Sequence, residues 1–534
     1  MKTLAFSAVL WYNFLMKKIH EIDKNNTETV TISRAEYESM KTQIDWLTQQ
    51  LTLAKNKQFG SSSEKANEEL CNQLSFFFNE AEAYLKSEEP VETEVSSHKR
   101  RKNSGNVKDI LPDNIQTEVI RHEIPEEERV CPECGDIMQE IGKEVRRTLK
   151  IIPAQAVLLE EWFYTYACKR CNDENIKTPV TKATKTPAVI PGSFASPEAI
   201  AHIMTQKFVM GSPLYRQELE LKNNGIQLSR QTMSNWILTA ADKWLRPVYD
   251  ELHKRLLNED ILHADETTLQ VLKEPGKKAE TKSYMWLYRT GMYAESPIVL
   301  YEYQPSRSRE HPIKFLNGFT GYLHTDGYSG YHNLPDSITV VGCWAHARRK
   351  FDEAVNAVPK AKRTPNSAAV TGLAYCTRLF TIEKQIASLS PKERYIKRQE
   401  LEKPILDALF AWVNTREAAP KSALGQAMTY LKNQQPYLES YMKDGRLELS
   451  NNRAERSIKP FVIDRKNFLF ANTPNGAQGS AMIFSLIETA KEAGLNPYKY
   501  LVYLLKTAPQ LSLENADWAE KILPQYAPDY CKAN

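Results

Sequence analysis

Cysteine is scarce in this chain, with eight residues in 534, and this density excludes a small disulfide-built scaffold. Glycine and proline contribute 20 and 28 residues, so collagen-like and low-complexity classes are excluded as well. No uninterrupted apolar run reaches the roughly 18 residues of a transmembrane helix. The formal net charge is only +4, so any affinity for nucleic acid must come from local clusters. We therefore expect a cytoplasmic protein with no membrane partner.

The length predicts several domains, because one domain per roughly 150 residues gives about three to four. Near the start, residues 4–16 are largely apolar, but polar residues interrupt them and no small-residue cleavage site follows. A signal-like segment and an N-terminal extension, with Met16 as an alternative start, are the two interpretations. We expect an extension over residues 1–31.

A heptad pattern over residues 32–79 predicts a coiled coil, and hence a homo-oligomer. Apolar side chains recur at spacings of three and four, at Tyr37, Met40, Ile44, Leu47, Leu51 and Ala54. The alternative is one amphipathic helix packed on its own chain. Residues 80–115 then run from a block of acids to a block of bases, which predicts a flexible charged linker.

Four of the eight cysteines form two C-x-x-C pairs separated by 33 residues, Cys131 with Cys134 and Cys168 with Cys171. Two such thiolate pairs fill the four positions of a tetrahedral zinc ion, so the predicted metal is structural. Disulfides or buried free thiols are the alternative. Residues 157–166, between the pairs, are strand-like, and we expect a zinc-binding module over residues 116–190.

Residues 191–258 show helical periodicity, with runs at 197–210 and 214–223 and a third from Ser229. A short helix, a glycine-containing turn and a helix with polar residues in its first turn are typical of a helix-turn-helix. In that interpretation Arg230 and Gln231 face DNA. A plain helical bundle is the alternative.

After Asp260 the pattern alternates, which predicts strands over residues 261–272, 283–291, 297–303, 321–325 and 338–343. A short helix at 313–319 and a helix from Trp344 complete the order of a ribonuclease H-like fold. In that layout Asp265 lies on the first strand and Asp326 at the end of the fourth, on neighbouring central strands. The two carboxylates are expected to meet at one edge of the sheet.

A third acid, Glu455, is expected on a later helix, on one face with Asn451, Asn452 and Lys459. Three such carboxylates suit two Mg²⁺ ions that stabilise the attacking and leaving oxygens of a phosphodiester displacement. Side chains that can hold a DNA backbone cluster beside these acids: His346, Arg348, Arg349, Lys350, Arg453, Arg456, Lys459, Arg465 and Lys466.

Each acid also has a simpler interpretation. Asp326 can begin a turn with Gly327, Asp265 can be a strand-end residue, and Glu455 can cap a helix together with Asn452. His263 and His324 each precede a proposed metal-binding aspartate by two residues, so each shares its strand face. They are either groups that support the site or satisfied histidines at a sheet edge.

The predicted fold class is multidomain α/β, with a ribonuclease H-like catalytic core that carries a helical insertion. A coiled coil, a zinc-binding module and a helix-turn-helix-like segment precede that core. Beyond residue 258 the predicted boundaries are the catalytic domain at 259–358 and 446–495, the helical insertion at 359–445 and a C-terminal helical tail at 496–534.

Several motifs resemble those of the insertion sequence 66 transposases, a bacterial family of DDE transposases. They are KQFGSSSEK at 57–65, CPECGD with CKRC, HADET, TDGYSGYH, GCWAHARRKF and DGRLELSNNRAERSIKPFVIDRKNFLF. The resemblance covers nearly the whole chain from about Ile32. It implies that Asp265, Asp326 and Glu455 bind the catalytic metals, that the four paired cysteines bind zinc, and that the segment before Asp260 helps to recognise DNA.

The sequence therefore favours a transposase that cuts double-stranded DNA at the ends of a mobile element and joins it to a target. Such an enzyme is nucleoid-associated when bound to DNA, and the resemblance implies accessory proteins of the same element as partners. A zinc-containing DNA-binding regulator without catalysis is the alternative from a different class. A nuclease of the same fold that cuts without joining is a third.

Overall fold

The computed structural model describes residues 156–167, 180–359 and 363–533. The predicted N-terminal extension, coiled coil, charged linker and all four paired cysteines lie outside these residues. The chain divides into two compact units, Glu88–Lys185 and a larger unit that contains Thr186–Asn534.

Within the smaller unit, β1 (Thr165–Ala167) and β2 (Val180–Lys182) pair in antiparallel fashion, Thr165 opposite Lys182. The two strands flank the Cys168–Cys171 pair in the sequence. The predicted strand over residues 157–166 is only partly correct, because residues 156–164 belong to no regular element. A strand needs a neighbour that binds its backbone groups, and in the described part of this unit β2 supplies that ladder only from Thr165 onward.

The larger unit begins with α7 (Pro197–Phe208), α8 (Leu214–Asn223), α9 (Arg230–Ala240), a π-helical turn at Ala241–Leu245 and α10 (Arg246–Leu257). Ser196 and Ser229 cap the starts of α7 and α9, accepting hydrogen bonds from the backbone N–H groups of Ala199 and Thr232. The helical periodicity of this segment is therefore confirmed. A short turn after Asn223 separates α8 from α9, as a helix-turn-helix requires.

A five-stranded sheet follows, formed by β3 (Ile261–Gln270), β4 (Lys282–Thr290), β5 (Val299–Gln304), β6 (Gly321–His324) and β7 (Ile338–Val341). Its order is β5-β4-β3-β6-β7. The β3–β4 and β4–β5 pairs are antiparallel, whereas β3–β6 and β6–β7 are parallel. The predicted adjacency of the first and fourth strands is confirmed. Two helices accompany the strands, α11 (Glu310–Phe315) before β6 and α12 (Trp344–Asn356) after β7.

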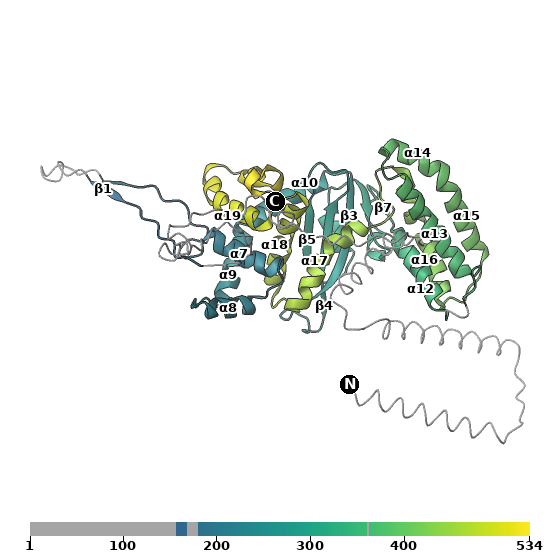
Figure 1. Ribbon diagram of the computed structural model, residues 1–534, viewed down its shortest axis with the longest axis horizontal. Coiled ribbons are helices and arrows are strands. Elements are labelled where there is room, and N and C mark those ends of the chain that lie inside the picture. The colour runs from purple at the N-terminus through teal and green to yellow at the C-terminus, as the bar shows by residue number, and fades with distance from the viewer. Residues whose placement is uncertain (1–155, 168–179, 360–362, 534) are drawn as a thin grey trace, which may run out of the picture. The chain divides into compact units, whose positions relative to one another are not determined.

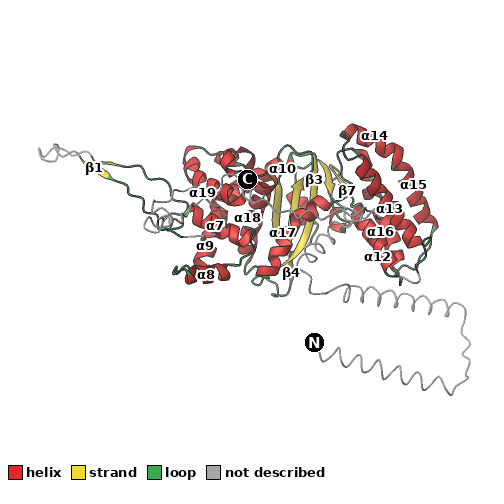
Figure 2. Cartoon of the chain, in the orientation of Figure 1, coloured by secondary structure: helices red, strands yellow, loops and turns green. Residues whose placement is uncertain are grey.

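Helices cover both faces of the sheet, and Figure 2 shows its yellow strands among red helices. On one face lies α17 (Asn452–Phe468), α10 and α11 cover the other, and α18 (Pro474–Glu492) runs along the edge strand β5. The edge strand β5 is protected, because Ser485 and Thr489 of α18 accept hydrogen bonds from its backbone N–H groups at 2.8 and 3.0 Å. An exposed edge would invite pairing with another chain.

The insertion between α12 and α17 is helical, as predicted, with α13 (Ala368–Gln385), α14 (Pro391–Leu401), α15 (Lys403–Thr415) and α16 (Ala423–Leu438). Of these helices, α13, α15 and α16 form a second hydrophobic core with α12, and Figure 1 shows the insertion beside β7. The C-terminal α19 (Pro497–Glu514) packs on α7 and belongs to the main core with the sheet.

Arg398 of α14 fastens the segment that returns from the insertion to α17. Its side chain is 0% exposed, and its guanidinium donates to both carboxylate oxygens of Glu383 at 2.6 and 2.8 Å. It also donates to the carbonyls of Tyr441, Asp444 and Leu447. We call residues 444–451 the return segment. A planar cation with several donors is suited to hold an acid and three carbonyls together.

We expect Arg398→Met to lower the free energy of unfolding by about 3–5 kcal/mol, because it leaves a buried acid and three carbonyls without their donor. Lys397→Met on the same helix is the control. Lys397 pairs with Glu400 at a solvent-exposed position, and its loss costs about 1 kcal/mol or less. Urea denaturation measures both, and equal effects would contradict the assignment.

Candidate functional site

Two predicted acids lie at the same edge of the sheet, on neighbouring parallel strands. His263 of β3 is paired with His324 of β6, and Asp265 and Asp326 each follow two residues later. The ladder continues past β6, since the Thr325 N–H donates to the Val341 carbonyl at 3.0 Å. Because side chains alternate along a strand, both aspartates continue the face on which the histidines stack.

Glu455 reaches this edge from the first turns of α17, where its side chain is 5% exposed. Asn451, which precedes α17, ties the helix start to β3. Its amide Nδ2 donates to the Ala264 carbonyl at 2.8 Å, one residue before Asp265, and its Oδ1 lies 3.0 Å from His263 Nδ1. The charges of Asp326 and Glu455 both act on Asp265, so the three acids lie in one region of this edge. That they share a metal site stays a prediction.

The electrostatics agree with this placement. Burial raises the pKa of Asp265 well above its usual range, and the charges of Glu266, Asp326 and Glu455 raise it further. Like charges gathered at a buried edge repel one another, and a divalent cation removes that repulsion. Carboxylate oxygens are also the ligands that Mg²⁺ prefers. The residue types of Asp265, Asp326 and Glu455 thus suit Mg²⁺, and a magnesium site formed by all three stays a prediction.

The simpler interpretations of these acids are partly visible as well. Asp326 accepts a hydrogen bond from the Tyr328 N–H at 2.8 Å, so it also shapes the turn after β6. The proposed helix cap is not observed, because no side chain caps the start of α17 and Asn451 binds β3 instead.

A fourth acid, Glu266, faces the other way and is held by protein groups. Arg307 Nε donates to it at 2.7 Å and the Tyr331 hydroxyl at 2.6 Å. Burial raises the pKa of Glu266 and the charge of Asp326 adds to the rise, while the bonds from Tyr331 and Arg307 oppose it. We assign it to the support of the turn after β6.

The start of α12 places two further groups beside Glu455, one of which the sequence interpretation missed. Cys343 Sγ, His346 Nδ1 and a Glu455 carboxylate oxygen lie within 4.8 Å of one another, and His346 Nδ1 is 3.7 Å from Glu455 Oε1. Burial raises the pKa of Cys343 to about 12 and lowers that of His346 to about 4. Burial thus favours the neutral form of each side chain. The C-x-x-H spacing after the fifth strand was the available signal.

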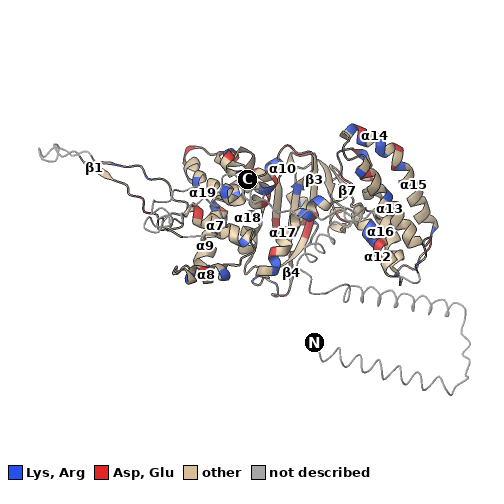
Figure 3. Ribbon diagram, in the orientation of Figure 1, with Lys and Arg blue, Asp and Glu red and all other residues tan. Residues whose placement is uncertain are grey.

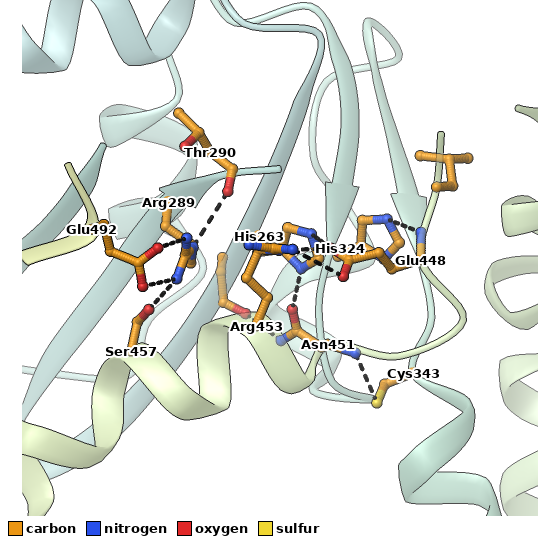
Figure 4. Close-up of polar contacts among 12 residues, drawn as sticks. His263, Arg289, Thr290, His324, Cys343, Glu448, Asn451, Arg453, Ser457 and Glu492 are labelled. Atoms are coloured by element: carbon orange, nitrogen blue, oxygen red, sulfur yellow. Dashed lines mark hydrogen bonds and ion pairs between the residues drawn. The ribbon is translucent and has the colours of Figure 1, made fainter. Parts of the chain in front are cut away.

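Behind the carboxylates lies a buried polar cluster that Figure 4 shows, built around His263 and His324. Their rings stack with centroids 4.3 Å apart, and both side chains are 0% exposed. Glu448 of the return segment lies 2.9 Å from His263 Nε2 and accepts from Arg453 at 3.0 Å. Of the two interpretations of these histidines, the structure favours groups that support the site, because His263 contacts Asn451 as well.

The predicted DNA-facing cations have unlike environments. Arg348 is 2% exposed and donates to Thr377 of α13, so its environment is the core beneath α12 rather than solvent. Arg453 pairs with Glu448, and Arg465 donates to Thr267 Oγ1 at 3.1 Å. On α17, Arg456 and Lys466 are solvent-exposed, and Figure 3 shows both basic and acidic positions on that helix.

Other predicted contacts lie at the site rim or apart from it. Arg349 and Lys350 of α12 are half-buried, as is Lys459 of α17. Arg230 and Gln231 are exposed at the start of α9. There the Arg230 backbone N–H donates to Glu218 at 3.0 Å and Gln231 donates to Asn235.

The insertion also reaches the site, which sequence reasoning missed. The Tyr430 ring of α16 lies against Gly327, the residue after Asp326, and Lys350 Nζ lies 5.1 Å from its centroid. Burial, together with the charges of Cys343 and Asp326, raises the pKa of the Tyr430 hydroxyl, so it stays protonated.

Comparison with known families follows this geometry. Residues 192–479, more than half of the 534, match the Transposase IS66 family. The chain belongs to the IS66 transposase family. The zinc-finger binding domain of transposase IS66 matches residues 128–172, a range that contains all four paired cysteines. The IS66 C-terminal element matches residues 485–524, and the Transposase C of IS166 homeodomain matches residues 46–120.

Three relatives of this IS66 transposase occur in Sinorhizobium fredii. Uncharacterized protein y4hP is 30% identical over 74% of this chain and 72% of its own length. Uncharacterized protein y4qI is 29% identical over 89% of this chain and 88% of its own length. Uncharacterized protein y4jD is 30% identical over 72% of this chain and 75% of its own length. The likeness extends over most of each chain, beyond the sheet alone.

The predicted family is thus confirmed, and with it a transposase-type zinc finger. Among the helices that the structure describes, none is long and apolar enough to cross a membrane.

We expect Glu448→Gln to destabilise the IS66 transposase at pH 7 by about 3 kcal/mol, because it removes one partner of a mostly buried charge pair. Burial alone would raise the pKa of Glu448, but His263 and Arg453 hold it well below its usual range. A depressed folded-state pKa contributes stability above the unfolded-state value of about 4.3, and this contribution is lost as the pH falls below it.

The difference in unfolding free energy between wild type and Glu448→Gln is therefore expected to be constant from pH 7 to about 5 and to narrow below about pH 4. Thermal melts across this range measure it. Glu400→Gln, at an exposed position of α14, is the control and should show almost no difference. A difference in unfolding free energy that does not decrease below about pH 4 would contradict the assigned charge pair.

Proposed function

We propose that this IS66 family member binds the ends of a bacterial insertion sequence and catalyses metal-dependent DNA cleavage and strand transfer. The observation that supports the proposal is that the charges of Asp326 and Glu455 both act on the buried Asp265. Asp265 and Asp326 each lie two residues after the paired histidines of the parallel strands β3 and β6. Glu455 lies on α17, whose start is hydrogen-bonded to β3 through Asn451.

The sheet order supports a ribonuclease H-like catalytic domain. β3 lies at the centre of the sheet, with the antiparallel strands β4 and β5 on one side and the parallel strands β6 and β7 on the other. The strand that carries Asp265 and the strand that leads to Asp326 are therefore neighbours. In this domain Asp265, Asp326 and Glu455 hold two Mg²⁺ ions. When bound, such ions lower the pKa of a water and stabilise the charge that develops on the phosphoryl group.

The chain's own groups position the substrate and the carboxylates. Asn451 and His263 hold the start of α17, so Glu455 needs no reorganisation when the site is filled. Exposed cations of α17, Arg456 and Lys466, contact the DNA backbone, together with Lys350 and Arg349 at the rim. Arg348, Arg453 and Arg465 instead stabilise the fold around the site.

End recognition is assigned to the α8–α9 pair. The exposed first turn of α9 offers Arg230 and Gln231 to the edges of base pairs, as the second helix of a helix-turn-helix does. Cys131, Cys134, Cys168 and Cys171 hold one structural zinc ion. The coiled coil brings copies of the chain together, and accessory proteins of the same element are further partners.

Asp265→Asn, Asp326→Asn and Glu455→Gln are each expected to reduce Mg²⁺-dependent cleavage of an end-containing duplex by roughly 100-fold or more, because each removes a charged metal ligand. DNA binding should persist in every case. Gel analysis of cleaved and joined products measures the loss, with Glu310→Gln, an exposed acid of α11, as control. Full cleavage by the Asp265→Asn protein would contradict the proposal, and binding without any cleavage by wild type would favour a regulator.

Purified protein is expected to contain about one zinc atom per chain, since four thiolates fill one tetrahedral site. Cys131→Ser or Cys168→Ser should remove it, whereas Cys71→Ser, a cysteine outside the two pairs, should leave it in place. Elemental analysis by mass spectrometry gives the ratio. Undiminished zinc in the Cys131→Ser protein would show that the ion is held elsewhere.

A further inference from the structure

The insertion helix α16 forms one wall of the carboxylate site, and two glycines allow it to approach. A Cβ atom on Gly327 would lie 2.7 Å from Tyr430 Cε2 and 2.8 Å from the Tyr430 hydroxyl. A Cβ atom on Gly342 would lie 3.1 Å from the backbone N of Leu438. Real Cβ atoms do not come as close as the first of these, so residue 327 must lack one for Tyr430 to occupy its place.

Hydrogen bonds set the register of this helix against the sheet edge. The Gly342 N–H donates to the Tyr437 carbonyl and Trp344 Nε1 to the Leu438 carbonyl, each at 2.8 Å. The ring of His332 stacks on Tyr437 with centroids 4.3 Å apart. The last turns of α16 are therefore anchored to the segments that follow β6 and β7, and the position of Tyr430 beside Asp326 is well determined.

The Tyr430 hydroxyl has no partner within the described part of the chain. Several other buried or half-buried tyrosines there donate to protein acceptors, as Tyr249 does to the Tyr301 carbonyl, Tyr331 to Glu266 and Tyr441 to Glu402. The buried Tyr288 hydroxyl, which lies in the core, has no such partner among the described residues. The Tyr430 hydroxyl makes no hydrogen bond to any residue that the structure describes, although its ring is half-buried. A half-buried donor is favourable when an incoming group accepts its hydrogen bond.

We propose that the Tyr430 hydroxyl donates a hydrogen bond to a non-bridging phosphate oxygen of DNA bound at Asp265, Asp326 and Glu455. This inference rests on the proposed function and adds a substrate-contacting residue that the insertion supplies. A phosphate is the acceptor that fits, because Lys350 lies over the same ring and adds positive charge to that wall. Because the phenol of Tyr430 is neutral, it can lie close to the carboxylates without increasing the electrostatic repulsion among them.

The test is Tyr430→Phe, which keeps the ring against Gly327 and Lys350 and removes only the hydroxyl. Tyr437→Phe, the same change on the same helix, is the matched control because its ring stacks on His332. The first measurement is binding of a fluorescein-labelled duplex copied from the DNA that flanks the coding sequence, in Ca²⁺, with a shuffled duplex beside it. The second is single-turnover cleavage of the same duplex in Mg²⁺.

Hydrogen bonds to charged groups contribute about 1.5–3 kcal/mol, so the ratio of cleavage rate to dissociation constant should fall roughly 10-fold or more in Tyr430→Phe. Tyr437→Phe should stay within about twofold of wild type. The Mg²⁺ concentration for half-maximal rate should not change in Tyr430→Phe, since the hydroxyl is assigned to DNA and not to the metals.

If Tyr430→Phe binds and cleaves the duplex within about twofold of wild type, the inference on Tyr430 is wrong. The proposed function still holds in that case, provided that wild type cleaves the duplex and Asp265→Asn does not. If wild type binds the duplex but does not cleave it, the proposed function is wrong, and the binding measurement alone then tests the contact between Tyr430 and DNA. Weaker binding by Tyr430→Phe than by Tyr437→Phe then supports the contact, and equal binding refutes it.

Discussion

The site depends on the hydrogen bonds of Asn451. Its side chain binds the Ala264 carbonyl and His263, and its backbone N–H donates to Cys343 Sγ at 3.2 Å. One residue thus joins β3, the start of α12 and the start of α17. Without this link the start of α17, which carries Glu455, would lose its hydrogen bonds to the strand of Asp265, and Arg465 would bind the helix to β3 only near its other end. The link holds the acids in place before any cation arrives.

The return segment extends this constraint into the insertion. Arg398 holds the carbonyls of Tyr441, Asp444 and Leu447, and Glu448 then reaches His263 beneath the site. Just before the return segment, α16, the last helix of the insertion, lies against Gly327 and Gly342. The helices between α12 and α17 are therefore bound to the catalytic sheet on both sides of the acids. These helices do more than provide a separate surface, because they position α17 and cover the edge of the sheet that carries Asp326.

Much of the fold follows from local patterns. The helical runs from Pro197, the five alternating strands and the helices of the insertion are local consequences of periodicity and capping, and they occur near the predicted places. The three acids were also identifiable, because residue types that bind metal stand out on predicted strand ends and helix faces. Charge alone was a weaker guide. Arg348 and Arg465 sit in basic clusters, yet packing turns one into the core and binds the other to β3, which no local pattern encodes.

The sequence by itself determined the family and the element order, since each is written in short motifs or in periodicity, and it also proposed the zinc-binding cysteines and the three acids. Only the tertiary structure decided what surrounds those acids. Cys343, Glu448 and Tyr430 join the site from segments that lie far apart in the chain, and their contacts arise where β3, α12, α16 and the return segment meet. Contacts between distant segments depend on packing and register, and neither can be inferred from the neighbours of a residue in sequence.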